Sequence, residues 1–318
     1  MQHKADGSIR DVLIVSVVAM SLAILAYLIS VRFEFIDPLF MSLLLGMAVR
    51  AAVGGERLNY EAITTLVRFT IPAGIVLYSA KIPLYTFGMA SVNRIVEIIW
   101  VMALYFLIIF TLGVKFGMGR RLTALIATGS AVCGASAIAI LSPLIRARKE
   151  EASIAIMTIT AVGLTGAMIA PILKDVLHLN PESYAFLAGA TLHQTGLVKI
   201  ASSYGGVEES ALAFKGIRIS MIAAAAVAVP WLLRGKPSFP LFIPPFLALS
   251  VLFSFVEPLK PVAMLLSPFA TFAFSVALAC IGLSIHMGSL ETARLRYLHT
   301  AYAGWVVVTL LVLLGEVG

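Results

Sequence analysis

Long apolar runs are the feature that most restricts how this chain can fold. Eleven segments are each long enough to cross a bilayer, which takes about 20 apolar residues in a helix. They cover residues 12–31, 37–54, 63–80, 93–113, 121–146, 150–172, 183–203, 209–233, 239–256, 262–286 and 298–315. Only 12% of the 318 residues are charged, against about a quarter in a soluble domain. We therefore expect one all-α polytopic transmembrane domain over residues 1–318, with about 9–11 hydrophobic segments.

The remaining composition excludes several classes of partner and cofactor. The net charge of +7 is typical of basic cytoplasmic loops in a membrane protein, so nucleic acid is not an expected partner. Cys133 and Cys280 each lie in an apolar run, without a CxxC pair or a histidine at ligand spacing. We interpret both as small buried side chains, so no disulfide, metal or other cofactor is expected. Run 12–31 is too long for a cleavable signal and is interpreted as the first span.

Two of the apolar segments are interrupted at their centres. Segment 121–146 contains the run GSAVCGAS at Gly129–Ser136, and segment 183–203 contains the run GATLHQTG at Gly189–Gly196. Small, polar, glycine-punctuated sequence makes poor continuous helix. It suits either close helix packing or a helix that is broken at mid-membrane, as in secondary transporters. We therefore expect two broken helices or re-entrant hairpins at these segments.

The distribution of basic residues favours hairpins. With the N-terminus inside and all eleven segments spanning, 13 basic residues fall inside and 7 outside. If the two interrupted segments are hairpins, the split becomes 15 to 5, which agrees better with the positive-inside rule. Each interrupted segment is also followed by a Glu-Glu pair, Glu150-Glu151 and Glu208-Glu209. This weak internal likeness predicts an inverted-repeat carrier fold.

Four basic residues between Ala188 and Ser220 lie within sequence that otherwise indicates membrane: His193, Lys199, Lys215 and Arg218. An ionisable group at bilayer depth costs at least about 2.5–3.5 kcal/mol. Lys215 and Arg218 are three residues apart, which places both heads on one helix face. A planar guanidinium beside a mobile ammonium suits an oxyanion, so we interpret the stretch as an anion pathway. The alternative is that these side chains lie at membrane edges and reach water.

Neighbouring polar groups complete the expected site. His193 is interpreted as a substrate ligand or proton relay, with a packed structural histidine as the alternative. The backbone amides around Cys133 could form the exposed start of a half-helix, which favours anions, although small residues there could serve packing alone. The substrate site is therefore expected to comprise Ser130, Cys133, Gly134, Ser136, Thr191, His193, Gln194, Lys199, Lys215 and Arg218.

These motifs resemble those of the YeiH family of membrane proteins, which carry the label of sulfate exporters. Residues Thr128–Ala139 are similar to the family's TGSAxCGAxA run, Gly189–His193 to its GASxH, and Lys215–Arg218 to its KxxR. Residues 45–50 and 279–283 also fit, so the resemblance covers nearly the whole chain. It implies an inner-membrane carrier similar to the bile acid/arsenite carriers, with inverted repeats and broken helices at the substrate site.

The chain departs from the family pattern at three positions. Gln194 stands where the family has Glu, Leu197 stands where it has Gln, and Lys199 stands where a small or apolar residue is expected. A carboxylate that could serve proton coupling is therefore absent, and a positive charge is gained. The substrate and coupling ion can differ from those of a typical member.

Three functional readings follow from the sequence. The favoured one is a secondary active transporter, expected to export a small anion such as sulfate or a sulfonate by alternating access in the cell (inner) membrane. No GxxxxGK[ST] motif is present, so ATP is not an expected energy source. The alternatives are an anion channel and an intramembrane hydrolase using Ser136 and His193, although no orienting acid is evident. Apart from the substrate and lipid, a second copy of the chain is an open partner, since Gly163-x-x-Gly166 could pack between subunits.

Overall fold

A computed structural model describes residues 2–33, 36–53, 59–82, 84–88, 90–234, 242–284 and 294–317, and these residues contain helices and turns but no strand. The α-helices are α1 (Gln2–Arg32), α2 (Pro38–Val53), α3 (Tyr60–Tyr78), α4 (Val92–Lys115), α5 (Arg120–Ala131), α6 (Ala135–Leu144), α7 (Lys149–Val176), α8 (Pro181–Thr191), α9 (Thr195–Ser203), α10 (Glu208–Ser220), α11 (Ile222–Arg234), α12 (Ile243–Phe255), α13 (Lys260–Ser284) and α14 (Arg294–Val317). Short 3₁₀ turns η2 (Ser79–Lys81), η3 (Leu84–Gly88) and η4 (Glu257–Leu259) complete the description.

Seven stretches of the described chain are long and apolar enough to cross a membrane. They are Arg10–Arg32, Glu61–Thr86, Val92–Lys115, Lys149–Val176, Glu208–Leu233, Glu257–Ser284 and Leu295–Glu316. Helices α2, α6 and α12 are shorter apolar helices. The expectation of an all-α polytopic membrane protein is confirmed. Residues 54, 239–241 and 285–286 of the expected segments lie outside the described residues.

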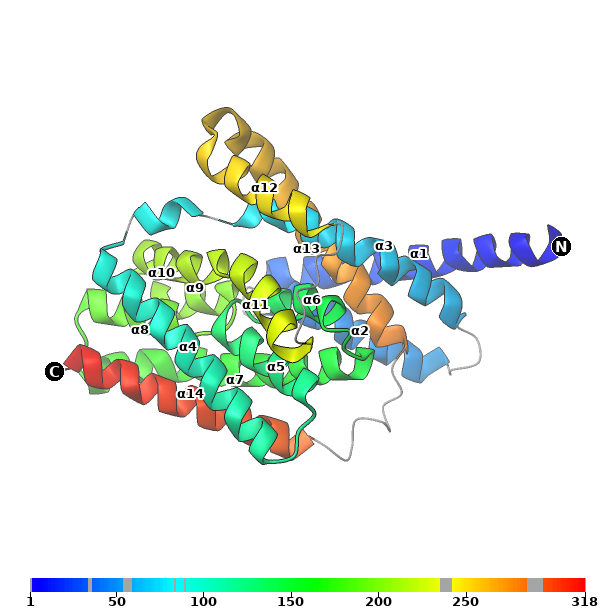
Figure 1. Cartoon of the computed structure of the whole chain (residues 1–318). Helices are drawn as coiled ribbons and strands as arrows, with labels where there is room; N and C mark the ends of the chain where they lie inside the picture. The colour runs from blue at the N-terminus through cyan, green and yellow to red at the C-terminus, as the bar shows by residue number, and fades with distance from the viewer. Residues whose placement is uncertain are drawn as a thin grey trace.

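The helices form two groups that meet along α6 and α7. Helices α1, α2, α3 and α13 pack on one another, with α12 against α3 and α13, while α4–α11 and α14 form the second group. Figure 1 shows the first group on the upper right and the second on the lower left, with the two chain ends at opposite sides of the molecule. Helix α6 contacts α2, α3 and α13, and α7 contacts α2 and α13, so these two helices form much of the junction between the groups.

The second interrupted segment is a hairpin. Helices α8 and α9 are separated by a break at residues 192–194. The hydroxyl of Tyr184, near the start of α8, donates a hydrogen bond of 2.6 Å to the carbonyl of Ala201, near the end of α9. The next residue beyond α9, Tyr204, donates a hydrogen bond of 2.5 Å to Asp175 at the end of α7. Both ends of this hairpin therefore lie at the C-terminal end of α7.

The first interrupted segment is also a hairpin, but it enters from the other end of α7. Helices α5 and α6 are separated by a break at residues 132–134. A Cβ placed on Gly119, just before α5, would lie 3.9 Å from a carboxylate oxygen of Glu151 in the first turn of α7. Helix α6 leads directly into that same turn. The two hairpins thus enter from opposite ends of a spanning helix, which an inverted repeat requires; the repeat itself stays a prediction.

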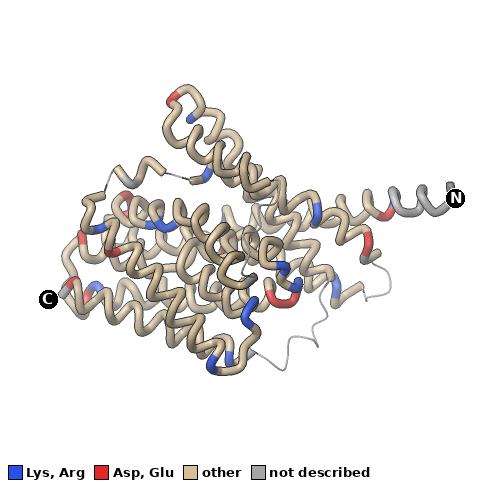
Figure 2. The backbone as a smooth tube through the Cα atoms, in the orientation of Figure 1, with Lys and Arg blue, Asp and Glu red and all other residues tan. Residues whose placement is uncertain are grey.

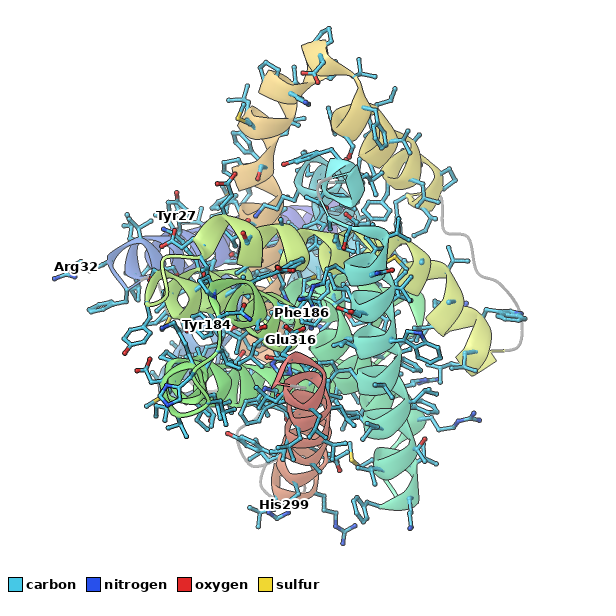
Figure 3. The ribbon with its side chains drawn as sticks, turned by 90° about the vertical axis from the view of Figure 1, so that its left-hand side faces the viewer. Tyr27, Arg32, Tyr184, Phe186, His299 and Glu316 are labelled. Atoms are coloured by element: carbon cyan, nitrogen blue, oxygen red, sulfur yellow. The ribbon has the colours of Figure 1, made fainter. Side chains whose placement is uncertain are left out.

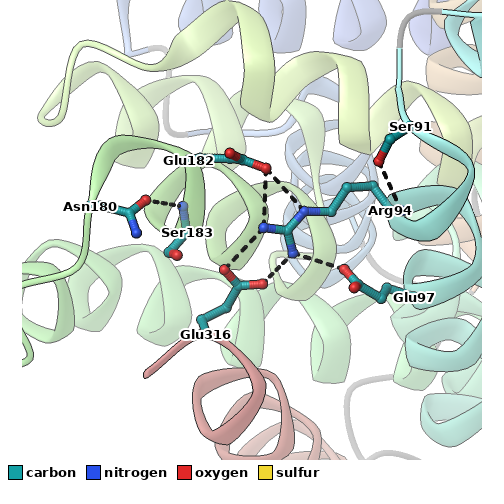
Figure 4. Close-up of polar contacts among 7 residues, drawn as sticks. All are labelled: Ser91, Arg94, Glu97, Asn180, Glu182, Ser183 and Glu316. Carbon is teal, nitrogen blue, oxygen red and sulfur yellow. Dashed lines mark hydrogen bonds and ion pairs between the residues drawn. The ribbon is translucent and has the colours of Figure 1, made fainter. Parts of the chain in front are cut away.

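Charged residues gather at the ends of the helices (Figure 2). One cluster ties together the starts of α4 and α8 and the end of α14, as Figure 4 shows. Arg94 pairs with Glu97 at 2.8 Å, with Glu182 at 3.2 Å and with the nearly buried Glu316. Its guanidinium also lies 4.6 Å from the ring centre of Phe186, which is beside Glu316 in Figure 3. The cluster fixes α14 against both α4 and the α8–α9 hairpin.

Helices α2 and α13 approach closely because glycines face each other. A Cβ on Gly46 would lie 2.3 Å from the carbonyl oxygen of Ala279, and a Cβ on Gly282 would lie 2.3 Å from that of Leu43. No real Cβ tolerates such a distance, and the obstacle is backbone rather than a flexible side chain. Small residues are the usual means by which membrane helices pack closely. Both glycines lie in the two outer motifs of the YeiH resemblance, which therefore form one contact.

We predict that Gly282→Ala destabilises the protein by about 1–3 kcal/mol, because the added methyl must push two backbones apart. The matched control is Gly315→Ala in α14, where an added Cβ meets nothing within 4 Å. That variant should be neutral or slightly stabilising, since alanine is the better helix former. Thermal unfolding in detergent, followed by circular dichroism at 222 nm, measures both. Equal melting temperatures for the two variants would contradict the close contact.

Candidate functional site

The tips of the two hairpins touch at the centre of the second helix group. A Cβ on Gly134, in the first tip, would lie 2.9 Å from Cγ of Gln194 and 3.3 Å from the carbonyl oxygen of His193 in the second tip. Gly134 also has a φ of 72°, a region that disfavours side chains. This glycine therefore serves both the reversal of the chain and the contact between tips.

Lys215 joins the two tips from α10. Its ammonium donates hydrogen bonds to the carbonyls of Val132 at 3.0 Å, Leu192 at 2.8 Å and His193 at 2.8 Å. Carbonyl oxygens only accept, so three such partners require the three hydrogens of the charged ammonium form. The side chain is fully buried, so it does not reach water.

Arg218 repeats this arrangement one turn further along α10. Its guanidinium donates to Ala131 at 3.0 Å and Ser130 at 2.6 Å in the first hairpin. It also donates to Gly189 at 3.1 Å and Leu192 at 2.8 Å in the second. These bonds use four of the five guanidinium hydrogens, and the side chain is fully buried.

The carbonyls that receive these bonds come from the last turns of α5 and α8 and from the tips that follow. The last carbonyls of a helix have no partner inside the helix, and inside a membrane no bulk water replaces that partner. A helix C-terminus also carries partial negative charge, which favours a cation. Lys215 and Arg218, here called the carbonyl clamp, therefore satisfy two half-helix ends at once. The predicted shared helix face is present, and burial excludes the membrane-edge alternative for this pair.

The other expected residues lie around the clamp in different environments. Thr191 donates to the carbonyl of Leu187 within its own helix at 2.6 Å, and its own carbonyl accepts from Tyr105 at 2.9 Å. Cys133 lies 3.5 Å from the hydroxyl of Tyr78. The Ser130 hydroxyl is buried without a hydrogen-bond partner among the described residues.

The side chain of His193 packs against α4 and α7. Its ring makes an edge contact with Tyr105, with 5.8 Å between ring centres, and its Cβ packs near Gly163 of α7. Both ring nitrogens are buried, and neither has a hydrogen-bond partner in the described part of the chain. His193 therefore forms no hydrogen bond with Ser136, which is the pairing that the hydrolase alternative needs.

The opposite ends of the tips, where α6 and α9 begin, present backbone N–H groups. Neither Gly134 nor Gln194, the residues that precede these helices, accepts a capping hydrogen bond from these N–H groups with a side chain. The start of α9 opens into a pocket of about 260 Å³ between the two helix groups. Its lining is Ser30, Ile36, Asp37, Pro38, Gln194, Gly196, Leu197 and Lys199. We call this the α9 pocket.

The α9 pocket holds two of the expected site residues, Gln194 and Lys199. The amide nitrogen of Gln194 donates to Thr160 at 3.0 Å, and its amide oxygen is buried without a partner in the described residues. The pocket is smaller than the roughly 300–1,000 Å³ typical of sites for drug-sized ligands, so it suits a small ligand. The expected single site is thus divided between a buried clamp and an adjoining pocket.

Sequence reasoning did not assign Asp37, Tyr78 or Tyr105 to the site. Asp37 lines the α9 pocket, while Tyr78 and Tyr105 contact the first and second tips. A carboxylate at the start of an apolar segment is a signal that could have identified Asp37. The two tyrosines stand in apolar runs like many packed aromatic residues, so the sequence carried no comparable signal for them.

We predict that Arg218→Met unfolds at a markedly lower temperature, losing at least about 3 kcal/mol, because four carbonyls lose a charged donor. Arg121→Met, which removes an exposed arginine at the start of α5, is the control and should be neutral. The two buried free thiols, Cys133 and Cys280, report unfolding through their reaction with a maleimide dye during heating. Unchanged protection of the thiols in Arg218→Met would contradict the structural role of the clamp.

Comparisons with known proteins agree with this architecture. Residues 12–301 match the family model described as conserved hypothetical protein 698. A UPF0324 membrane protein of Archaeoglobus fulgidus is 39% identical over 290 residues, covering 91% of this chain and 88% of that protein. A UPF0324 membrane protein of Bacillus cereus is 28% identical, covering 86% of this chain and 80% of that protein. No solved structure matches the chain.

A further relative carries the family name that the motifs suggested. The UPF0324 inner membrane protein YeiH of Salmonella typhi is 25% identical over 253 residues, covering 74% of this chain and 72% of that protein. Together with the seven apolar helices, these relatives confirm the expected location, a multi-pass protein of the cell (inner) membrane. The chain belongs to the conserved hypothetical protein 698 family, the family of the YeiH-type membrane proteins that its motifs resemble.

Proposed function

We propose that this protein is a secondary carrier for a small anion, such as sulfate or a sulfonate. The observation that carries the proposal is the carbonyl clamp. Lys215 and Arg218 are both fully buried, and neither lies within ion-pair distance of a carboxylate in the described chain. Buried charges are normally paired with an opposite charge. Here the hydrogen-bond partners among the described residues are neutral carbonyls, and Arg218 also lies 5.7 Å from the ring centre of Tyr105, so a positive field is left at the hairpin tips.

The helix dipoles do not cancel this field. Each C-terminal end, at α5 and α8, contributes about half a negative charge, and each N-terminal end, at α6 and α9, contributes about half a positive charge. These four contributions offset one another, so the charges of the two side chains remain. In a low-dielectric interior such a field attracts an anion strongly. The same field opposes the binding of a cation.

The α9 pocket is the place where we propose that the anion binds. It lies at the N-terminal end of α9, beside the clamp, and it includes the cationic Lys199 and the amide of Gln194. Backbone N–H groups at a helix start bind oxyanions readily. The pocket also lies between the two helix groups, where a relative movement could open it to either side, as alternating access requires.

The proposed direction of transport rests only on the resemblance to the YeiH family, whose members bear the label of sulfate exporters. A carrier without an ATP-binding motif works in the direction that its gradients impose. Export is therefore proposed as the physiological direction, and reconstituted protein should also catalyse exchange. A channel is one alternative, and it would conduct without saturation at low anion concentration.

We predict saturable uptake of labelled sulfate into proteoliposomes that contain the protein, with competition by sulfite or a sulfonate. Lys199→Met should raise KM by about three- to tenfold, because one partly solvated charge in the pocket is lost. Lys115→Met, an exposed lysine at the end of α4, is the control and should leave KM unchanged.

Several outcomes would contradict the proposal. No saturable flux of any tested oxyanion, under imposed pH or sodium gradients, would exclude an anion carrier. Non-saturating current would assign the protein to the channels. Saturable flux with an unchanged KM in Lys199→Met would retain the carrier and move the substrate away from the α9 pocket.

A further inference from the structure

Asp37 is a carboxylate inside the pocket where the anion is proposed to bind. It lies between α1 and α2, and it lines the α9 pocket together with Lys199, Gln194 and the start of α9. Its Oδ1 accepts hydrogen bonds from the backbone N–H groups of Leu39 at 2.9 Å and Phe40 at 3.0 Å. These bonds, both to the same carboxylate oxygen, fix the carboxyl group at the start of α2.

The charged and titratable groups around Asp37 come from several elements. Lys81 of η2 and Tyr78 of α3 interact electrostatically with it, and Lys199 of α9 lines the same pocket. Cys133 of the first tip contacts the Tyr78 hydroxyl and interacts electrostatically with Lys81. Arg32, at the end of α1, is exposed and points away from the body (Figure 3). No second carboxylate lines the pocket within the described chain.

An ionised Asp37 and a bound anion exclude one another, because like charges in a small, half-enclosed pocket repel strongly. Protonation of Asp37 removes this repulsion. It also adds an O–H group that can donate a hydrogen bond to an oxyanion. Burial raises the pKa of the Asp37 carboxyl, against the opposing effect of the amides of Phe40 and Leu39 and of Lys81. The proton is therefore held more readily here than on an exposed aspartate.

We propose that Asp37 is the proton-binding site that couples anion movement to the proton gradient, so that the proton and the anion occupy the α9 pocket in the same state and cross together. This inference rests on the proposed function. It assigns the coupling role to a residue on the α1–α2 side of the pocket, although the sequence lacks the family's carboxylate beside His193.

A stoichiometry of one proton per divalent anion affects the direction of transport. One proton carried with one divalent anion moves one net negative charge. An inside-negative membrane potential then drives the pair outward, whereas an inwardly directed pH gradient drives it inward. Export of sulfate is thus compatible with proton co-transport when the potential dominates.

The test is sulfate and proton flux in proteoliposomes, measured with labelled sulfate and a trapped pH dye, for wild type and Asp37→Asn. Asparagine keeps an oxygen that can accept from Leu39 and Phe40, so the start of α2 is retained. Asp175→Asn, which changes an exposed aspartate at the end of α7, is the matched control. Wild type and control should show sulfate uptake that an inward pH gradient accelerates, with protons entering alongside. Asp37→Asn should exchange sulfate at a rate independent of the gradient and without proton entry.

A binding measurement separates coupling from folding. For wild type, sulfate affinity followed by calorimetry should weaken about tenfold for each pH unit above the pKa of Asp37 and level off below it. For Asp37→Asn it should be independent of pH. A folded Asp37→Asn that binds no sulfate at any pH, or that keeps the pH dependence, would overturn the inference.

The failures of the two proposals are distinguishable. Wild-type sulfate flux without proton movement would reject the coupling role of Asp37 and leave the carrier intact. Absence of wild-type flux under every gradient would reject the carrier itself. Proton-coupled flux that persists in Asp37→Asn would assign the coupling proton to another residue.

Discussion

The structure depends on satisfying backbone carbonyls where no bulk water is present. A half-helix that ends at the centre of a membrane leaves its last carbonyls without partners. Two such ends meet in this protein, and one helix, α10, supplies both cations that bond to them. The same contacts therefore reduce two free-energy costs. One is the desolvation of Lys215 and Arg218, and the other is the burial of helix-end carbonyls without partners. The hairpins and the buried cations therefore stabilise each other.

Because each clamp residue bonds to both tips, the two hairpins and α10 form one mechanical unit. Their contacts with α4, α7 and α14 belong to the same helix group, and the Arg94 cluster binds α14 to α4 and α8. The group that holds α1, α2, α3 and α13 is joined internally by the glycine contact between α2 and α13. A movement that opens the α9 pocket is easier between these two groups than within either of them.

The sequence was sufficient for the fold class and for the position of both breaks, because hydropathy and glycine content are local properties. The positive-inside count also favoured hairpins over spanning broken helices, and the hydrogen bond between Tyr184 and Ala201 agrees with it. The sequence could not reveal that Lys215 and Arg218 bond to carbonyls. Spacing on a helix shows which side chains share a face, but it does not show what lies opposite. Tyr105 was missed for the same reason, since its partners Thr191 and His193 are distant in the chain. Asp37 did carry a signal, as a carboxylate at the start of an apolar segment, but its place in the α9 pocket depends on tertiary packing.

The hydrogen bonds of the carbonyl clamp change how the buried charges relate to a substrate. A cation that donates every hydrogen to the protein, as Lys215 does, cannot also bind an anion directly, yet its charge still acts through space. The clamp would then set the sign of the field, while the helix start, Gln194 and Lys199 would make the contacts. A carboxylate in that pocket opposes the same field, and its protonation state decides how much of the field an anion experiences. A positive field with one titratable carboxylate is thus a physical basis for coupling an anion to a proton.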